Sequence, residues 1–231
     1  MITPFWRKKW KGLYYRIYFT KVEDSYIFAM DLSGIPPQDD TVIGSIRFDY
    51  SNVEKINKKF KKKFSKILRK KGKELRRKEL RKILEFLNGE NISMGAVKCT
   101  KYNWDKRLSN IPKQISYKKE KLYGILYFLA LKMQSERGKH YSVVVCKESF
   151  MDINRVLSTC KELAEYYSLS YDFSISSGNL NFMIKIADYV ASAGRKFKHI
   201  DLDEFDNFTF LSTDIPYYYV RYSFKLFDKR K

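Results

Sequence analysis

The segment YIFAMDLSG, residues 26–34, is apolar almost throughout and then stops at Asp31, Ser33 and Gly34. A short apolar run bounded by turn residues predicts a β-strand, and the absence of polar alternation is typical of a strand that is buried on both faces. We therefore expect Tyr26–Asp31 to lie at the centre of a sheet. The pair Pro36-Pro37 interrupts regular structure in the loop that follows.

Further strands are expected on both sides of this segment in the chain. They are predicted over residues 13–20, 42–49, 92–99, 141–146, 169–175 and 216–227. Apolar residues at spacings of three and four predict helices over residues 51–88, 120–133, 152–167 and 180–197. A basic loop is expected between the strand at 92–99 and the helix at 120–133.

Within 51–88, Ser51 and Glu54 have the spacing of a capping box, and Gly72 is expected to break the helical pattern in two. The order of elements predicts one α/β domain over residues 1–231, in which a mixed central sheet is flanked by helices and carries added N-terminal and C-terminal strands.

The helical segment 51–88 is strongly basic. It holds sixteen Lys or Arg against four Glu, in a chain whose net charge is +20. A solvated helix face usually mixes Glu with Lys, whereas runs such as Lys61-Lys62-Lys63 repel one another. A polyanion would relieve that repulsion, so we expect this segment to bind nucleic acid through phosphate contacts that carry no sequence preference.

Aromatic residues set among charges are predicted to stack on bases, which would favour single strands or RNA loops. The stacking candidates are Trp6, Trp10, Tyr102 and Trp104. The basic residues expected to contact phosphates are Lys58, Lys59, Lys61, Lys62, Lys63, Lys70, Lys71, Arg76, Arg77, Lys78 and Arg81.

Several classes of site and location are disfavoured by composition. Cys99, Cys146 and Cys160 have no metal-ligand spacing and are interpreted as free core thiols, and only two histidines occur. Any metal site is therefore expected to use oxygen ligands. The sequence has neither a signal-peptide pattern nor an apolar run long enough to span a membrane, which predicts a soluble cytoplasmic protein. The Lys-rich, Gln-poor composition is typical of thermophile proteins.

Two motifs in the expected order resemble a known family. They are DLSG at residues 31–34, which closes the apolar strand, and LNFMIKIADYVASA at residues 180–193. They are similar to the motifs of a large, mostly uncharacterised family with a "DESG" strand near its start and an "LQLADxxAGA" helix near its end. Residues 74–76 and 122–131 also resemble its middle part, and the likeness extends from about residue 26 to residue 196.

The resemblance implies a ribonuclease-H-like fold, in which acidic residues from the first strand and a late helix meet at a divalent-metal site. The matching residues are Asp31 and Asp188, which would hold Mg²⁺ or Mn²⁺ through carboxylate oxygens. The chain departs from the family pattern at Leu32, where the family has Glu, and at Cys146, where an Asp is expected. Glu148 or Asp152 would then be the substitute acid.

A further acid from the basic helices, Glu74 or Glu79, could complete the site, and spacing does not choose between them. Three hypotheses follow. The first is a metal-dependent nuclease with catalytic residues Asp31, Asp188 and Glu148. The second is a non-catalytic nucleic-acid-binding protein with a degenerate site. The third is an interaction module that docks on an acidic protein or a membrane surface.

Overall fold

The computed structural model describes residues 26–35, 38–176 and 181–224. Its core is a six-stranded mixed sheet in the order β5-β4-β1-β2-β3-β6. The strands are β1 (Tyr26–Ser33), β2 (Thr41–Asp49), β3 (Ser93–Cys99), β4 (His140–Cys146), β5 (Ser170–Ser176) and β6 (Phe208–Thr213).

β1 lies inside the sheet, as its apolar sequence predicts. It pairs antiparallel with β2 and parallel with β4. Because successive side chains point to opposite faces of a sheet, Phe28 and Met30 enter the apolar core on one face, and Ile27 and Ala29 enter the core on the other. Both faces of β1 are therefore covered by helices.

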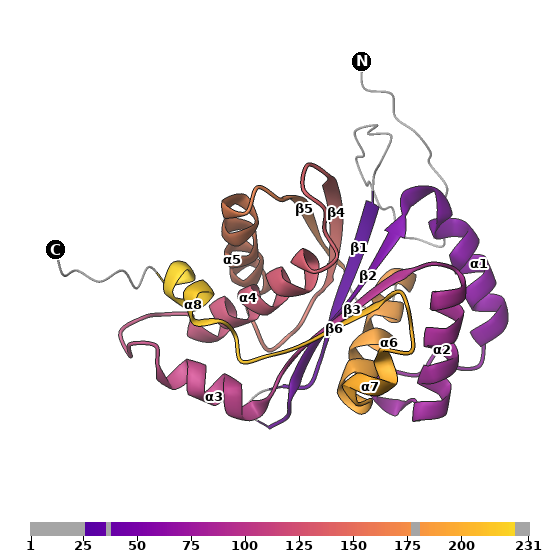
Figure 1. Cartoon of the computed structure of the whole chain (residues 1–231), viewed down its shortest axis with the longest axis horizontal. Coiled ribbons are helices and arrows are strands. Elements are labelled where there is room, and N and C mark those ends of the chain that lie inside the picture. Colours follow the sequence, from indigo (N-terminus) through magenta and orange to yellow (C-terminus); the bar gives the residue numbers. More distant parts are fainter. Residues whose placement is uncertain (1–25, 36–37, 177–180, 225–231) are drawn as a thin grey trace, which may run out of the picture.

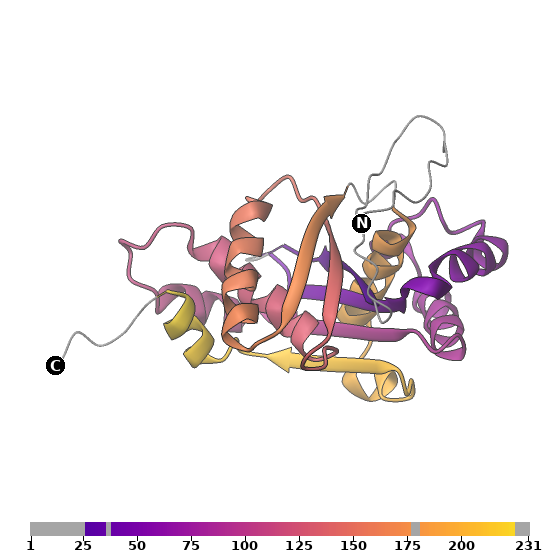
Figure 2. The ribbon, with the colours of Figure 1, turned by 90° about the horizontal axis from the view of Figure 1, so that it is seen from above.

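The helices form one layer on each face of the sheet (Figures 1 and 2). One layer contains α3 (Lys101–Ser109), α4 (Lys118–Lys132), α5 (Ile153–Tyr166) and α8 (Tyr217–Ser223). The other contains α1 (Val53–Phe64), α2 (Arg77–Gly89), α6 (Phe182–Lys196) and α7 (His199–Leu202). Two short 3₁₀ helices are η1 (Tyr50–Asn52) and η2 (Gly72–Glu74), the second between α1 and α2.

α6 packs very closely on β2, and small residues allow this approach. A Cβ atom at Gly44 would lie 2.4 Å from the backbone nitrogen of Ala191 and 2.5 Å from the carbonyl oxygen of Ala187. Backbone atoms cannot rotate out of the way, so only glycine fits at this crossing. The small residues in the 180–193 motif therefore set the distance of α6 from the sheet, and with it the position of Asp188.

The predicted α/β class and the mixed, helix-flanked sheet are confirmed. The C-terminal strand predicted over 216–227 is wrong, because residues 217–223 form α8. Burial of Tyr219, Val220 and Ser223 at helical spacing overrides the β-propensity of tyrosine there. The edge strand on that side is β6, which pairs parallel with β3.

Two local predictions also need correction. The segment expected to be a basic loop contains α3, whose N-terminus is capped by the Thr100 hydroxyl. The predicted Ser51 cap is wrong, because α1 begins at Val53 with Asn52 at its N-cap. The break at Gly72 is confirmed by η2. The strand predicted over 13–20, like Trp6 and Trp10, lies outside the described residues.

Within the described part of the chain, no helix combines the length and the apolar character that crossing a membrane requires.

Candidate functional site

Asp31 and Cys146 lie at the same edge of the sheet. β1 and β4 run parallel with Met30 opposite Val145, so the next residue of each strand is placed at their shared carboxyl end. Asp31 and Cys146 come two residues after Ala29 and Val144, which face the α6 side of the sheet. Since residues two apart in a strand point to the same face, both side chains face α6. The carboxyl ends of parallel strands are where open α/β sheets commonly bind ligands.

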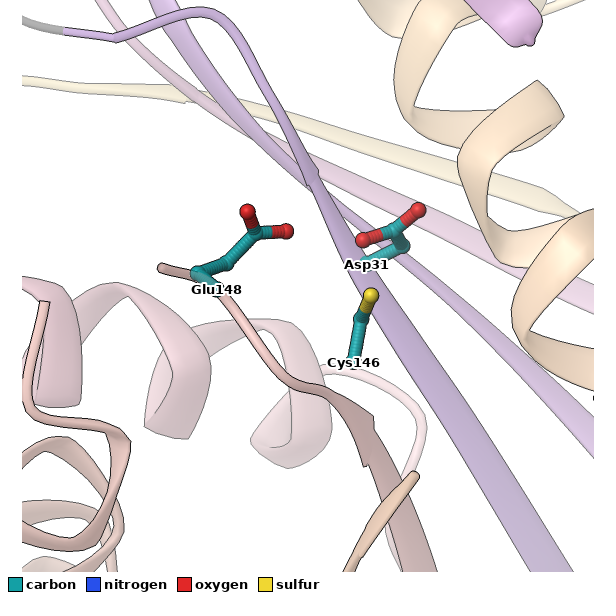
Figure 3. Close-up of side chains that lie close together, drawn as sticks. All are labelled: Asp31, Cys146 and Glu148. Atoms are coloured by element: carbon teal, nitrogen blue, oxygen red, sulfur yellow. The ribbon is translucent and has the colours of Figure 1, made fainter. Parts of the chain in front are cut away.

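Glu148 follows β4 by two residues and completes a group of three. One ligand atom from each of Asp31, Cys146 and Glu148 lies within 4.8 Å of the others. Figure 3 shows the Glu148 carboxylate and the Cys146 sulfur extending toward Asp31. Two carboxylates and a thiol form a donor set that a divalent cation accepts, so these residues fit a metal ion.

Asp31 is almost completely buried, with 8% of its surface exposed. Burial raises the pKa of its carboxyl well above the ordinary value, and the charges of Asp188 and Glu148 raise it further. The Leu32 N–H donates to Asp31 Oδ1 at 2.9 Å and opposes that rise. A carboxyl group in this position favours a proton or a cation beside it.

Glu148 is also affected by its surroundings. Burial is the largest cause of its raised pKa, and the charge of Asp188 adds to it. Hydrogen bonds with Asp31 and Cys146 act in the opposite direction, as does the positive charge of Lys71. The two carboxyl groups of Asp31 and Glu148 are therefore close enough to share one proton when no cation is bound.

Asp188 is not a member of this three-residue group, and the structure shows another contact for it. The Gly72 N–H donates to Asp188 Oδ2 at 2.7 Å, and Lys185 Nζ lies 3.9 Å from the same oxygen. Burial nevertheless raises the pKa of Asp188. Since its charge also raises the pKa of Asp31, Asp188 borders the site.

The connector between α1 and α2 brings positive charge to this edge. Two side chains of α6 bind this connector. The Asp188 carboxylate accepts a hydrogen bond from the Gly72 N–H, and the Tyr189 hydroxyl donates to the carbonyl oxygen of Ile67 at 3.0 Å. Lys71 is exposed on this connector, and its charge lowers the pKa of both Asp188 and Glu148. One predicted phosphate contact is thus placed beside the acidic group.

Glu74 and Glu79 have structural partners. Glu79 accepts from the Arg76 N–H at 2.8 Å at the start of α2 and pairs with Lys70 Nζ at 3.1 Å. These hydrogen bonds lower the pKa of Glu79 to about 2. Glu74 accepts from the Lys71 N–H at 3.1 Å. Asp152, the alternative to Glu148, caps α5 and pairs with Arg155, so Glu148 is the acid that joins Asp31.

The basic residues of α1 and α2 project outward. α1 buries Ile56, Phe60 and Phe64 against the α2 and α6 side, which leaves its lysines on the opposite surface. All eleven predicted phosphate contacts are exposed except Lys70, which is half-buried. Four of them form ion pairs: Lys59 with Glu90, Lys70 and Arg76 with Glu79, and Arg81 with Glu85 and Glu204.

The prediction that Trp104 stacks on bases is wrong. Its side chain is only 2% exposed and packs against Tyr123, with ring centroids 4.7 Å apart. Trp104 lies on α3, about one turn after the Thr100 N-cap, and at this position its side chain points into the core beneath α4. Tyr102, on the outer side of the same helix, is 73% exposed and keeps a ring face for stacking.

Cys146 is the site residue that the sequence interpretation missed. All three cysteines are buried free thiols, as predicted, but Cys146 lies among carboxylates whereas Cys160 lies in the apolar core. The signal for it was its place at the end of a predicted strand, where the family pattern has an Asp.

Comparison with known proteins finds no matching family model and no matching curated protein.

Proposed function

We propose that this protein binds nucleic acid through its α1–α2 surface and cleaves the phosphodiester backbone at the Asp31–Glu148 edge, in a ribonuclease-H-like fold. The observation that carries the proposal is the adjacency of the two features. Lys71 belongs to the basic segment and precedes Gly72, whose N–H donates to Asp188 Oδ2 at 2.7 Å. The charge of Lys71 also lowers the pKa of Glu148 and of Asp188. A backbone bound along the basic helices would therefore reach the acidic group.

Each part of the chain has a stated task in this proposal. The lysines and arginines hold phosphates and release counterions, without reading bases. Asp31 and Glu148 hold a divalent ion, Mg²⁺ or Mn²⁺, and Asp188 borders them. When bound, such an ion supplies positive charge to the attacking and leaving oxygens of the phosphoryl group. The mixed sheet order and the acids from β1 and α6 are compatible with the ribonuclease-H-like fold.

The binding half is tested by charge reversal on the outer face of α1. Lys55, Lys58 and Lys62 are exposed, lie opposite the buried stripe of α1, and form no ion pair with any described residue. The triple variant Lys55→Glu/Lys58→Glu/Lys62→Glu should weaken binding of labelled duplex DNA and RNA. On duplex DNA, the slope of log K against log salt should fall by about 0.9 for each phosphate that the variant no longer neutralises.

The matched control carries the same change in net charge on the other face of the sheet. Lys106, Lys113 and Lys119 are exposed and are near or on α3 and α4. Their triple reversal should leave both the affinity and most of the salt slope in place. Equal losses of affinity in the two triples would mean that net charge alone drives binding, and unchanged binding in the α1 triple would remove the proposed interface.

The cleavage half is tested separately from binding. Asp31→Asn and Glu148→Gln should each abolish Mg²⁺- or Mn²⁺-dependent cleavage and leave affinity nearly unchanged, because phosphate binding resides in the basic helices. Single-stranded and double-stranded DNA and RNA should all be assayed.

The second candidate function is non-catalytic nucleic-acid binding. One observation favours it: the Asp188 carboxylate accepts a hydrogen bond from Gly72 and is not a member of the three-residue group. Tight binding by the wild-type protein with no cleavage of any of these substrates would establish this second function in place of the first.

A further inference from the structure

The metal-ligand group contains a sulfur atom, which changes the ion that it suits. Mg²⁺ requires octahedral coordination by oxygen ligands and keeps most of its water. Thiolate ligands instead favour ions that accept sulfur, with Zn²⁺ the common biological example. In Asp31, Cys146 and Glu148, one of three donors is a thiol that is 9% exposed and therefore belongs to the buried side of the group.

The number and spacing of the donors also match a zinc site. Catalytic zinc sites have three protein ligands and leave a fourth position for water, with bonds of about 2.0–2.3 Å. The three ligand atoms lie within 4.8 Å of one another, so small side-chain rotations would bring them onto one ion. Glu148 lies beyond the end of β4, where its side chain is less constrained by the ladder.

A second, independent feature points to a polar ligand at this place. The Tyr127 hydroxyl, on α4, is completely buried and has no hydrogen-bond partner among the described residues. A buried hydroxyl without a partner is costly and is rare in folded proteins. Burial raises the pKa of this phenol most, and the charges of Asp31, Glu148 and Cys146 raise it further, so the hydroxyl is within electrostatic range of the same three residues. A water molecule on the fourth position of a bound ion could supply the missing partner.

We infer that Cys146 is a metal ligand and that Asp31, Cys146 and Glu148 form a site that binds Zn²⁺ in preference to Mg²⁺, so that Zn²⁺ replaces Mg²⁺ or Mn²⁺ as the ion of the proposed site. This inference rests on the metal site of the proposed function but not on cleavage. Binding exchanges the thiol proton for the ion: the S–H bond breaks, a sulfur–metal bond forms, and the proton passes to the buffer. No oxidant or reductant takes part.

The test adds Co²⁺ to the metal-free, full-length protein and records the absorption spectrum. A cobalt–thiolate bond gives a charge-transfer band, which Zn²⁺ should remove by displacement and Mg²⁺ should not. Cys146→Ser should lose the band and bind Zn²⁺ at least about tenfold more weakly. Mutation of a residue that only hydrogen-bonds a metal ligand often lowers metal affinity by about this factor, so removal of a ligand should lower it at least as much. Cys146→Asp should also lose the band and gain affinity for Mg²⁺ relative to Zn²⁺.

The other two cysteines provide a control that does not depend on the stability of the Cys146 variants. The double variant Cys99→Ala/Cys160→Ala retains Cys146 as the single cysteine of the chain, and it should keep the band. Absence of the band in the wild-type protein overturns the inference. Retention of the band in Cys146→Ser also overturns it, because another cysteine would then be the ligand.

Failure of this inference can be distinguished from failure of the proposed function. A Co²⁺ band without cleavage of any nucleic acid in the presence of Mg²⁺, Mn²⁺ or Zn²⁺ supports Cys146 ligation and removes the nuclease. Mg²⁺-dependent cleavage without the band removes Cys146 ligation and keeps the nuclease.

Discussion

Gly72→Ala should destabilise the protein, because η2 lies directly on α6 at this residue. An added Cβ would lie 2.4 Å from Ser192 Oγ, 2.6 Å from the Asp188 carbonyl oxygen and 2.8 Å from Asp188 Oδ1. The serine hydroxyl can rotate away, but the backbone carbonyl of α6 cannot. The connector must therefore move, and the hydrogen bond from Gly72 to Asp188 is broken.

Two contributions set the size of the effect. Overpacking a well-packed contact costs about 1–3 kcal/mol. A hydrogen bond to a charged group contributes about 1.5–3 kcal/mol. We expect the free energy of unfolding to fall by at least about 2 kcal/mol, which corresponds to a decrease in Tm of at least about 4 °C for a chain of this size.

Urea unfolding followed by circular dichroism measures this decrease, and Gly89→Ala provides the matched control. A Cβ at Gly89 meets no atom within 4 Å, so the same chemical change there should alter stability by less than about 0.5 kcal/mol. If Gly72→Ala and Gly89→Ala unfold at the same urea concentration as the wild type, the close contact between η2 and α6 is refuted.

Three further predictions concern single side chains. Burial raises the folded-state pKa of Asp31, so the charged carboxylate destabilises the fold at pH values above the ordinary carboxyl pKa. Asp31→Asn should therefore stabilise the metal-free protein at neutral pH and not at strongly acidic pH. Urea titrations that show lower stability of the variant at both pH values would contradict this prediction. The pKa of Glu79 is shifted in the opposite direction, to about 2, so its charged form stabilises the fold. Glu79→Gln should therefore lower stability at neutral pH, and the difference from the wild type should disappear as the pH falls from 4.5 toward about 2. Thermal unfolding at several pH values measures this difference. Trp104→Ala should lower the free energy of unfolding by about 3–5 kcal/mol, because it removes a large side chain from the core. Trp104→Phe should leave nucleic-acid affinity unchanged in an anisotropy titration. A weakened affinity of this variant would show that Trp104 belongs to the interface.

Local patterns in the sequence predict most of the elements. The apolar run at 26–31 forms β1, and the three-and-four spacing of apolar residues in 51–88 forms α1 and α2 with a break at Gly72. These predictions succeed because burial on one face or on both faces leaves a periodic trace in a single segment. The basic surface is predictable for the same reason, since the apolar stripe leaves only the outer face for the lysines.

The failures occur where distant residues decide the outcome. Residues 217–223 have the composition of a strand, but α4 and α5 bury Tyr219 and Val220 at helical spacing. Trp104 is surrounded by polar and charged residues in sequence, and only the packing of α3 under α4 shows that its ring is in the core. Neither contact leaves a trace in the neighbouring residues.

The sequence by itself determined the class of the fold, the central position of β1, the positive charge of the segment 51–88, and Asp31 as a candidate acid. Only the tertiary structure decided which side chains accompany that acid. The parallel register of β1 and β4 brings Cys146 and Glu148 to Asp31, while the Gly72 N–H holds Asp188 beside them. The physical reason is that periodicity records how one segment is buried, whereas a site depends on strand order and register between segments far apart in the chain.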